Sequence, residues 1–286
     1  MKEIIMNNND IQKTGLNRNT LDKYYTKQSV AEECINKIKE YILINKTDLI
    51  IEPSAGNGSF IKYIKTLSDN HKFFDLEPDN NEITKQDFLK YNYDDILKTF
   101  NNIHIIGNPP FGRQSSLAIK FIKICCHFAN SISFILPKSF KKDSMRRYFS
   151  NYFYLIYEND LPQNSFLVND IEKDVPCVFQ IWEKRTEKRK EQKKLKPKNF
   201  EFVKKEDNPD ISFRRVGVYA GTISKEISNK SIQSHYFIKL INNKSIDNFY
   251  NKLQEIIFKT NNTVGPKSIS KQEVIIEYNK ILKSKK

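Results

Sequence analysis

The segment GNPPFG, residues 107–112, combines residue types that can bind an amino group. Pro109 and Pro110 fix φ, remove two backbone donors and keep the preceding Asn108 out of the helical region. The side-chain oxygen of Asn108 and the carbonyl of Pro109 can therefore point into a cavity and accept the two hydrogens of one amine. Two such acceptors favour a pyramidal nitrogen with an available lone pair. Phe111 adds an aromatic face, so the segment could hold a flat amine and make its nitrogen nucleophilic.

A second candidate is the glycine turn IIEPSAGNGSF, residues 50–60, which follows an apolar run and opens an expected helix. Small residues in such a turn let the backbone approach a ligand at the carboxyl edge of a sheet, where nucleotides bind. A tight structural turn would use the same residues. The chain has only eight glycines, and four of them flank the two Pro-containing turns: Gly56, Gly58, Gly107 and Gly112.

An acidic residue stands where a ribose-binding carboxylate is expected. Asp75, in FFDLEPDN, ends an apolar run seventeen residues after Gly58. A carboxylate at that place can accept both ribose hydroxyls, because the usual offset from the glycine turn is roughly 20 residues. Glu77 lies on the same strand face and is an alternative holder of the ribose. Either acid could instead be an exposed surface residue.

Elements that alternate in type must position these residues. Ser29 and Glu32 form a capping-box pattern that predicts a helix at 29–43. Short apolar runs then alternate with helical patterns, which indicates a parallel α/β sheet with helices on both faces. The expected strands are 49–51, 72–76, 103–106, 132–136, 153–157 and a late edge strand at 175–182, and the expected helices begin at 58 and span 116–129 and 246–258.

Composition places the chain among soluble globular proteins. It has 286 residues, 38% of them hydrophobic, with 20 Phe and 14 Tyr, so it can bury a core. No apolar run approaches a membrane span and no secretory signal is present, so we expect a cytoplasmic protein without a membrane partner. The four cysteines and four histidines lack metal-ligand spacing. We therefore predict reduced core cysteines and no metal.

The net charge of +14 is unevenly distributed: residues 1–140 carry +2 and residues 141–286 carry +12. This split suggests a near-neutral half with one task and a basic half that faces a polyanion. We expect a mobile arm at 1–21, an α/β domain at 22–183, a basic linker or loop at 184–199 and a small substrate-binding extension at 200–286.

Nucleic acid is the polyanion that we expect to bind. In residues 183–198, nine of sixteen side chains are Lys or Arg and none is aromatic, which fits either a solvated connector or a loop that contacts nucleic acid. Tyr236 and Phe237 of the extension could also contact nucleic acid or could simply pack. The candidate nucleic-acid-binding residues are Arg113, Lys138, Lys188, Arg189, Lys190, Lys193, Lys194, Arg214 and Arg215.

Four motifs in sequence order, EPSAGNGSF, FDLEP, QDFL and NPPFG, resemble the adenine-specific amino methyltransferases that depend on S-adenosyl-L-methionine. The resemblance covers residues 22–137, and the preceding YYTKQ fits the motif order of the gamma-type enzymes. It implies a Rossmann-like methyltransferase fold and that cofactor. The cofactor-binding residues that it implies are Tyr25, Thr26, Glu52, Pro53, Ala55, Gly56, Gly58, Asp75, Leu76, Asp87, Phe88 and Asn108, and the catalytic ones are Asn108, Pro109, Pro110 and Phe111.

The resemblance implies transfer of a methyl group to the 6-amino group of adenine in nucleic acid, with Phe111 stacked on a flipped-out base. Phe111 replaces a Tyr that many members have, which keeps the stacking face. DNA is the favoured substrate and RNA the alternative, because the extension is small for a DNA-recognition domain. Two further alternatives are a protein glutamine methyltransferase of the release-factor type and a catalytically inactive subunit that binds nucleic acid.

Overall fold

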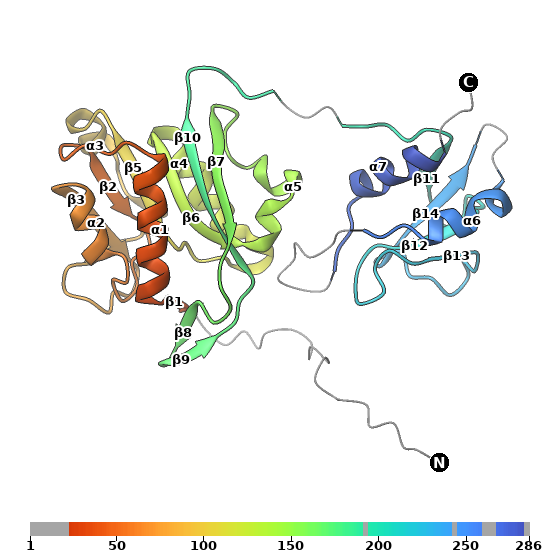
Figure 1. Cartoon of the computed structure of the whole chain (residues 1–286), viewed down its shortest axis with the longest axis horizontal. Coiled ribbons are helices and arrows are strands. Elements are labelled where there is room, and N and C mark those ends of the chain that lie inside the picture. The colour runs from red at the N-terminus through yellow and green to blue at the C-terminus, as the bar shows by residue number, and fades with distance from the viewer. Residues whose placement is uncertain (1–22, 191–193, 242–244, 259–266, 283–286) are drawn as a thin grey trace, which may run out of the picture.

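The computed structural model describes residues 23–190, 194–241, 245–258 and 267–282. The expected arm at 1–21 and Lys193 lie outside the described residues. The described chain forms two α/β lobes (Figure 1). The large lobe comprises residues 23–184 and the small lobe residues 199–282.

A seven-stranded sheet forms the centre of the large lobe, in the order β4-β3-β2-β5-β6-β10-β7. All pairs from β4 to β6 are parallel, and β10 runs antiparallel to both of its neighbours. This topology confirms the predicted α/β class with a Rossmann-like methyltransferase arrangement. The strands are β2 (Leu49–Glu52), β3 (Asn70–Asp75), β4 (Thr84–Lys85), β5 (Ile103–Gly107), β6 (Ser131–Pro137), β7 (Phe153–Asp160) and β10 (Cys177–Lys184).

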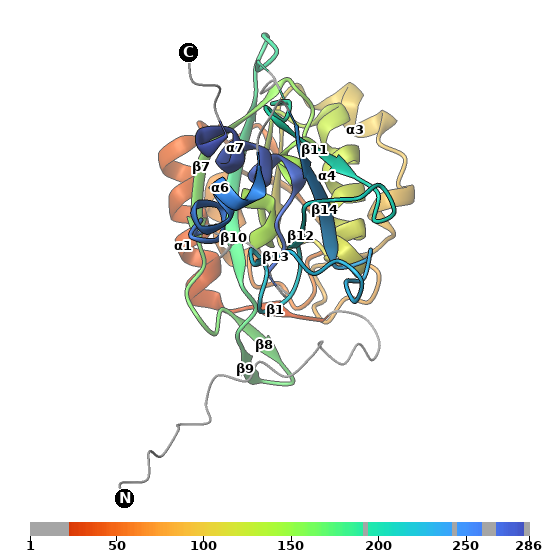
Figure 2. The ribbon, with the colours of Figure 1, turned by 90° about the vertical axis from the view of Figure 1, so that its right-hand side faces the viewer.

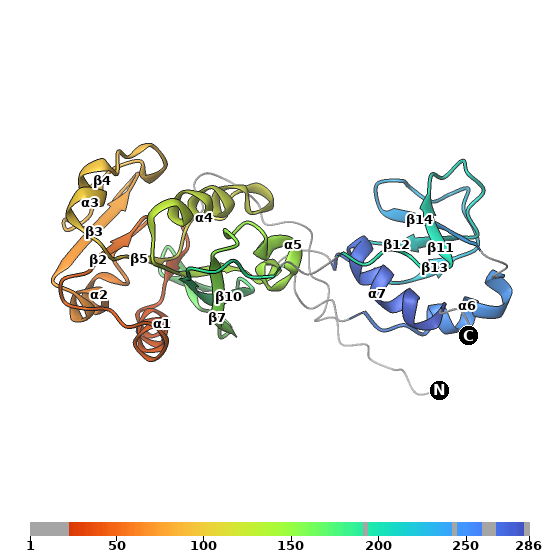
Figure 3. The same ribbon diagram turned by 90° about the horizontal axis from the view of Figure 1, so that it is seen from above.

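Helices cover both faces of this sheet, as Figure 3 shows. On one face, α1 (Gln28–Tyr41) and α2 (Ile61–Leu67) contribute to one hydrophobic core. On the other, α3 (Asp94–Thr99) and α4 (Ser116–Phe128) contribute to a second. A short helix, α5 (Asp143–Arg146), and three 3-10 turns at 88–90, 113–115 and 138–141 complete the lobe. All four cysteines are free; Cys34, Cys125 and Cys177 are buried as predicted, whereas Cys126 is half-buried.

The predicted capping box at the start of α1 is wrong. The helix begins at Gln28, its N-cap is Lys27, and no side chain caps it. The Lys27 N–H donates to the Ser165 carbonyl at 3.0 Å. This pairing holds the chain extended up to Lys27, so Ser29 lies inside the first turn rather than before it.

The strand predicted at 175–182 is not an edge strand, contrary to the prediction. β10 lies between β6 and β7, and β7 forms the edge. The first six residues of β10 are buried. All of these residues except Gln180 are apolar, which is typical of a strand that is covered on both faces.

A hairpin inserted between β7 and β10 returns to the start of the chain. It consists of β8 (Phe166–Val168) and β9 (Ile171–Lys173), and β8 pairs with β1 (Tyr25–Thr26). Figure 1 shows this three-stranded sheet below the main one. The hairpin therefore fixes β1 beside the large sheet.

The small lobe is a four-stranded antiparallel sheet with its own hydrophobic core (Figures 1 and 2). Its order is β11-β14-β12-β13, and α6 and α7 pack on one face. The helix expected at 246–258 is confirmed but ends at Gln254. The elements are β11 (Phe200–Val203), β12 (Ile211–Arg214), β13 (Ile223–Ser224), β14 (His235–Leu240), α6 (Ile246–Gln254) and α7 (Lys271–Ile281).

The basic segment 184–198 is anchored to both lobes. The Arg189 guanidinium donates to the carbonyls of Arg146 and Phe149 and lies 5.5 Å from the Trp182 ring. At its other end, the segment exchanges hydrogen bonds with Gln272 and Asn279 of α7. In the part of the chain that the structure describes, no helix is long and apolar enough to cross a membrane, and no group of His, Cys, Asp and Glu could hold a metal ion.

Candidate active site

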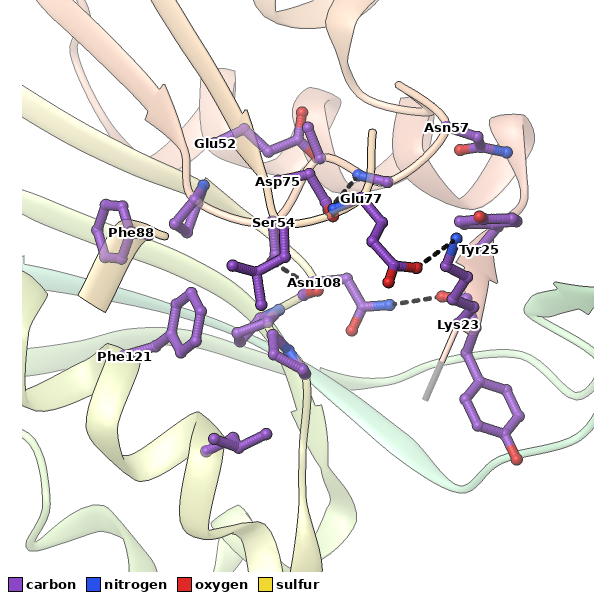
Figure 4. A pocket seen from close by; sticks show the side chains of 18 of the residues that line it. Lys23, Tyr25, Glu52, Ser54, Asn57, Asp75, Glu77, Phe88, Asn108 and Phe121 are labelled. Carbon is purple, nitrogen blue, oxygen red and sulfur yellow. Dashed lines mark hydrogen bonds and ion pairs between the residues drawn. The ribbon is translucent and has the colours of Figure 1, made fainter. Parts of the chain in front are cut away.

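The main pocket lies where β2, β3 and β5 end, at the carboxyl edge of the large sheet. Figure 4 shows side chains from all three strand ends and from β1 pointing toward the same space. Of the residues predicted for the cofactor and for catalysis, all line the pocket except Gly58. Those that line it are Tyr25, Thr26, Glu52, Pro53, Ala55, Gly56, Asp75, Leu76, Asp87, Phe88, Asn108, Pro109, Pro110 and Phe111.

The glycine turn brings its backbone close to β1 and β3. Gly56 has φ of +55°, and a Cβ there would lie 2.9 Å from a ring carbon of Tyr25. Its N–H donates to the Asp75 carboxylate at 2.8 Å. Gly58 instead supports the turn from behind: it has φ of +85°, and a Cβ there would lie 2.8 Å from both Asn80 and Ile61. Both glycines are therefore required for shape, but only Gly56 faces the pocket.

Asp75 is held in a fixed orientation by backbone donors. One carboxylate oxygen accepts from the Gly56 N–H at 2.8 Å and the other from the Glu77 N–H at 2.9 Å. A carboxylate oxygen accepts more than one hydrogen bond, so each retains capacity for a hydroxyl. Glu77 is exposed, lines the same pocket and forms a 3.2 Å ion pair with Lys23.

Glu52 is a buried carboxyl at the floor of the pocket. Only 2% of it is exposed, and its Oε2 has no hydrogen-bond partner among the described residues. Burial raises the pKa of Glu52 well above its ordinary value, and the nearby Asp75 carboxylate raises it further. A buried acid that lacks a partner is costly unless a ligand supplies one. Glu52 and Asp75 together favour a ligand that carries positive charge.

Asn108 is oriented so that its amide oxygen is available. Its side-chain nitrogen donates to the Tyr24 carbonyl at 3.2 Å and to the Thr26 hydroxyl at 3.3 Å. Its Oδ1 is buried and has no hydrogen-bond partner in the described chain. The Ser54 hydroxyl donates to the Asn108 backbone carbonyl at 3.1 Å, which fixes the main chain as well (Figure 4). Asn108 thus presents an unsatisfied acceptor to the pocket, in addition to the carboxyl of Glu52.

Aromatic rings form the remaining walls. Phe88 is buried and stacks on Phe121 of α4, with ring centroids 5.4 Å apart and an interplanar angle of 9°. Phe111 is half-buried and packs against both hydrophobic cores of the large lobe. Asp87 accepts from the Leu89 N–H and so caps the 3-10 turn that carries Phe88. Flat rings could therefore be held beside Phe88 and beside Phe111.

β1 closes the pocket on the side of the glycine turn. The Tyr25 hydroxyl donates to Asp79, and burial together with this bond raises the pKa of Tyr25 to about 12. Thr26 is buried against Asn108. Further lining residues were not predicted individually, although several lie within the motifs: Ser54, Asn57, Ser59 and Phe60 in the glycine turn, and Gln86 and Leu89 in QDFL. Lining residues outside the motifs include Lys23, Leu117 and Phe121.

The candidate nucleic-acid-binding residues are dispersed. Arg113 is exposed just after the NPPF segment, Lys188 lies over the Tyr152 ring, and Lys190 and Lys194 are exposed. Four others are engaged within the protein. Lys138 pairs with Asp160 at 2.9 Å, Arg189 donates to the Arg146 carbonyl, Arg214 donates to the Val216 carbonyl, and Arg215 donates to the Gln233 carbonyl. In the extension, Phe237 is buried and Tyr236 packs against Phe202 and Phe213.

No family model and no curated protein matches this sequence. Several solved structures are similar to parts of it. The 23S rRNA methyltransferase ErmE is 11% identical, over 59% of this chain and 72% of that one, with a TM-score of 0.41. An rRNA methylase from Streptococcus thermophilus is 14% identical, over 55% and 94%, with a TM-score of 0.35. A protein from Thermoplasma acidophilum is 19% identical, over 55% and 90%, with a TM-score of 0.38. The function is therefore inferred from the geometry of the site and not from these similarities.

Proposed function

We propose that the protein is an S-adenosyl-L-methionine-dependent methyltransferase that acts on the 6-amino group of adenine in nucleic acid. The observation that carries the proposal is the state of Asn108. Its amide nitrogen donates to Thr26 of β1 and to Tyr24 just before β1, and its oxygen is a buried, unsatisfied acceptor at the pocket. Such an acceptor requires a hydrogen-bond donor, and an amino group supplies one.

The residues present fit the cofactor. Asp75, fixed by two backbone N–H groups, would accept the ribose hydroxyls, and Phe88 would contact the adenine ring. The buried acid Glu52 suits a ligand with positive charge, as S-adenosylmethionine has. The cofactor supplies an electrophilic methyl group on a sulfonium.

The NPPF residues would prepare the amine. Adenine's 6-amino nitrogen is a poor nucleophile because its lone pair is delocalised into the ring. Asn108 Oδ1 and the Pro109 carbonyl would bind its two hydrogens and favour a pyramidal nitrogen, and Phe111 would stack on the base. The nitrogen lone pair of the bound amine would attack the methyl group that the cofactor supplies, and the sulfur would keep the electron pair of the broken C–S bond. The methylated amine would be acidic and would lose its proton to solvent, so no general base is required.

Nucleic acid is the proposed substrate because residues 141–286 carry a net charge of +12. We favour DNA, and RNA is the second candidate because the small lobe offers a short recognition region. Residues 22–183 would form the catalytic domain, 184–199 a basic linker and 200–286 the substrate-binding part.

The test is methyl transfer from labelled cofactor to duplex DNA, single-stranded DNA, RNA and a release factor, measured side by side. We expect labelled N6-methyladenine in a nucleic acid and no labelled protein. Label on glutamine of the release factor would overturn the proposed substrate. Cofactor binding without transfer to any of the four would indicate an inactive binding subunit.

A further inference from the structure

The small lobe has a second pocket, on the face of its sheet opposite the lobe's hydrophobic core. Ser212 and Arg214 alternate with two buried core residues along β12 and so share the outer face. The register extends this face, since Ser224 of β13 lies opposite Ser212 and His235 of β14 lies opposite Arg214. Three strands thus place polar side chains around one cavity.

The cavity is cationic. Arg214 and Lys230 line it together with His235. The Arg214 Nε–H donates to the Val216 carbonyl, but within the described residues the guanidinium has no carboxylate at ion-pair distance. Lys230 has only the exposed Glu226 at 3.8 Å. Ser224 accepts from the Glu226 N–H through its hydroxyl oxygen, which leaves the hydroxyl hydrogen to donate.

The positive charge around the pocket also affects the pKa of His235. Burial lowers its pKa, and the Ser231 carbonyl opposes that effect. Arg214, Lys230 and Lys205 then lower the pKa further. A bound anion would offset the repulsion among these groups.

An exposed aromatic ring stands at the rim of the pocket. Tyr219 lines the cavity although it is 69% exposed, and Val218 beside it is 82% exposed. The Thr222 side chain and N–H both donate to the Tyr219 carbonyl, which fixes the backbone of this loop. An exposed aromatic side chain next to a cationic cavity suits a base that is joined to a phosphate.

We propose that Arg214, Lys230 and Ser224 bind one backbone phosphate of the nucleic-acid substrate and that Tyr219 stacks on the adjacent base. The proposal rests on the proposed function, because it takes nucleic acid to be the substrate. It is more specific than the general basicity of the second half, since it assigns one phosphate to one pocket. Arg215, the neighbour of Arg214, is outside it and lies over the Tyr236 ring.

The experiment measures binding of fluorescein-labelled 12-nucleotide DNA and RNA single strands to the full chain by anisotropy. The variants are Arg214→Gln, Lys230→Gln and Tyr219→Ala, with Lys252→Gln on the exposed side of α6 as the matched control. We expect each pocket variant to weaken binding about tenfold or more and the control to bind like the wild type. In the double variant Arg214→Gln/Lys230→Gln, the slope of log affinity against log salt concentration should also become shallower by about 0.7.

Tyr219 is exposed, so Tyr219→Ala tests the pocket even if Arg214→Gln unfolds the lobe. Wild-type affinity and salt slope in all three variants would overturn the phosphate site, as would a wild type that binds neither strand. Methylation of nucleic acid together with unaffected pocket variants would leave the proposed function standing alone. Weakened binding by the pocket variants without methylation of any nucleic acid would support the phosphate site and contradict the proposed function.

Discussion

In the proposed mechanism, the side-chain oxygen of Asn108 binds the amine of the substrate rather than the cofactor. We predict that Asn108→Ala lowers turnover by about 100-fold or more while cofactor affinity persists, because the removed Oδ1 is an acceptor for the amine. Turnover is measured by methyl transfer and affinity by calorimetry. Parallel loss of both would show that Asn108 holds the cofactor instead. Ser54→Ala, which removes a hydrogen bond to the Asn108 main chain only, should have a smaller effect.

Asp75 is predicted to bind the ribose hydroxyls of the cofactor. Asp75→Ala removes charge-assisted hydrogen bonds of roughly 1.5 to 3 kcal/mol each, so cofactor affinity should fall at least tenfold. Because Asp75 also accepts from the Gly56 and Glu77 N–H groups, thermal unfolding must be measured on the same sample. Glu77→Ala is the control. Normal binding by Asp75→Ala with failure of Glu77→Ala would assign the ribose to Glu77.

Glu52 should couple cofactor binding to a proton. Burial and Asp75 raise its pKa in the free protein, and a cationic ligand favours the ionised form. Binding therefore releases a proton, and affinity should increase as the pH rises through the pKa of free Glu52. Calorimetry in buffers of different ionisation enthalpy measures that release. In Glu52→Gln the release should disappear, and its persistence would place the proton on another group.

At the scale of elements, a buried polar cluster joins the amino ends of three strands. His104 of β5 contacts the Ser131 hydroxyl of β6 at 2.7 Å, and its other ring nitrogen lies 3.4 Å from the carboxylate of Asp48, just before β2. Burial lowers the pKa of His104, although Asp48 opposes this effect. The folded protein therefore favours neutral His104, and protonation favours the unfolded chain.

The stabilisation should be complete above the ordinary histidine pKa of about 6.5 and be lost as the pH falls through the lowered pKa of the folded state. Urea unfolding between pH 8 and pH 5 measures it. We expect His104→Gln to flatten this dependence, whereas the exposed His127→Gln should retain it. Equal slopes in the two variants would contradict the assignment.

The sequence predicts this fold where local pattern and tertiary contacts agree. The runs that end in Glu52 and Gly107 are fully buried strands, the run that ends in Asp75 is a strand buried at Phe73 and Phe74, and chain order then brings the three ends together. Prediction failed where distant pairing decides. The start of α1 depends on the hydrogen bond from Lys27 to the distant Ser165, and the place of β10 depends on pairing with β6 and β7. Neither contact can be recognised from the local sequence.

The same reasoning explains the small lobe. Its strands are short and their register gathers the second pocket, which no spacing along the sequence displays. The helix α7 was missed although Ser270 and Glu273 form a capping box there, because the lysine-rich composition of the tail hid the pattern. Site residues such as Phe121 come from helix packing and also have no motif.

At the scale of the whole molecule, the charge of the second half should act through phosphates without reading sequence. We predict that replacing Lys188, Lys190, Lys193 and Lys194 with Gln weakens binding of all duplex sequences similarly, with cofactor affinity unchanged. The salt slope should fall by about 0.9 for each phosphate that the variant no longer neutralises. Arg189 is left intact because its guanidinium anchors the segment to the large lobe. Affinity is measured by anisotropy over a range of salt concentrations.

The control for that variant removes the same charge from exposed lysines of the large lobe, by replacing Lys39, Lys62, Lys85 and Lys98 with Gln. An unchanged slope in the linker variant, or an equal change in the control, would show that residues 184–198 are a solvated connector. The hydrogen bonds of this segment to α7 should survive in either case.

During synthesis, strand β1 can pair with strand β8 only after β8 has been made. Asn108 is oriented by Tyr24 and Thr26, and these are held in place by pairing of β1 with Phe166–Val168. Ribosomes add about 5 to 20 residues per second, so the two strands emerge roughly 7 to 28 s apart. The glycine turn and Asp75 therefore leave the ribosome well before the strand that fixes β1. The β1 side of the pocket, and with it the orientation of Asn108, can be completed only after Phe166–Val168 has been made.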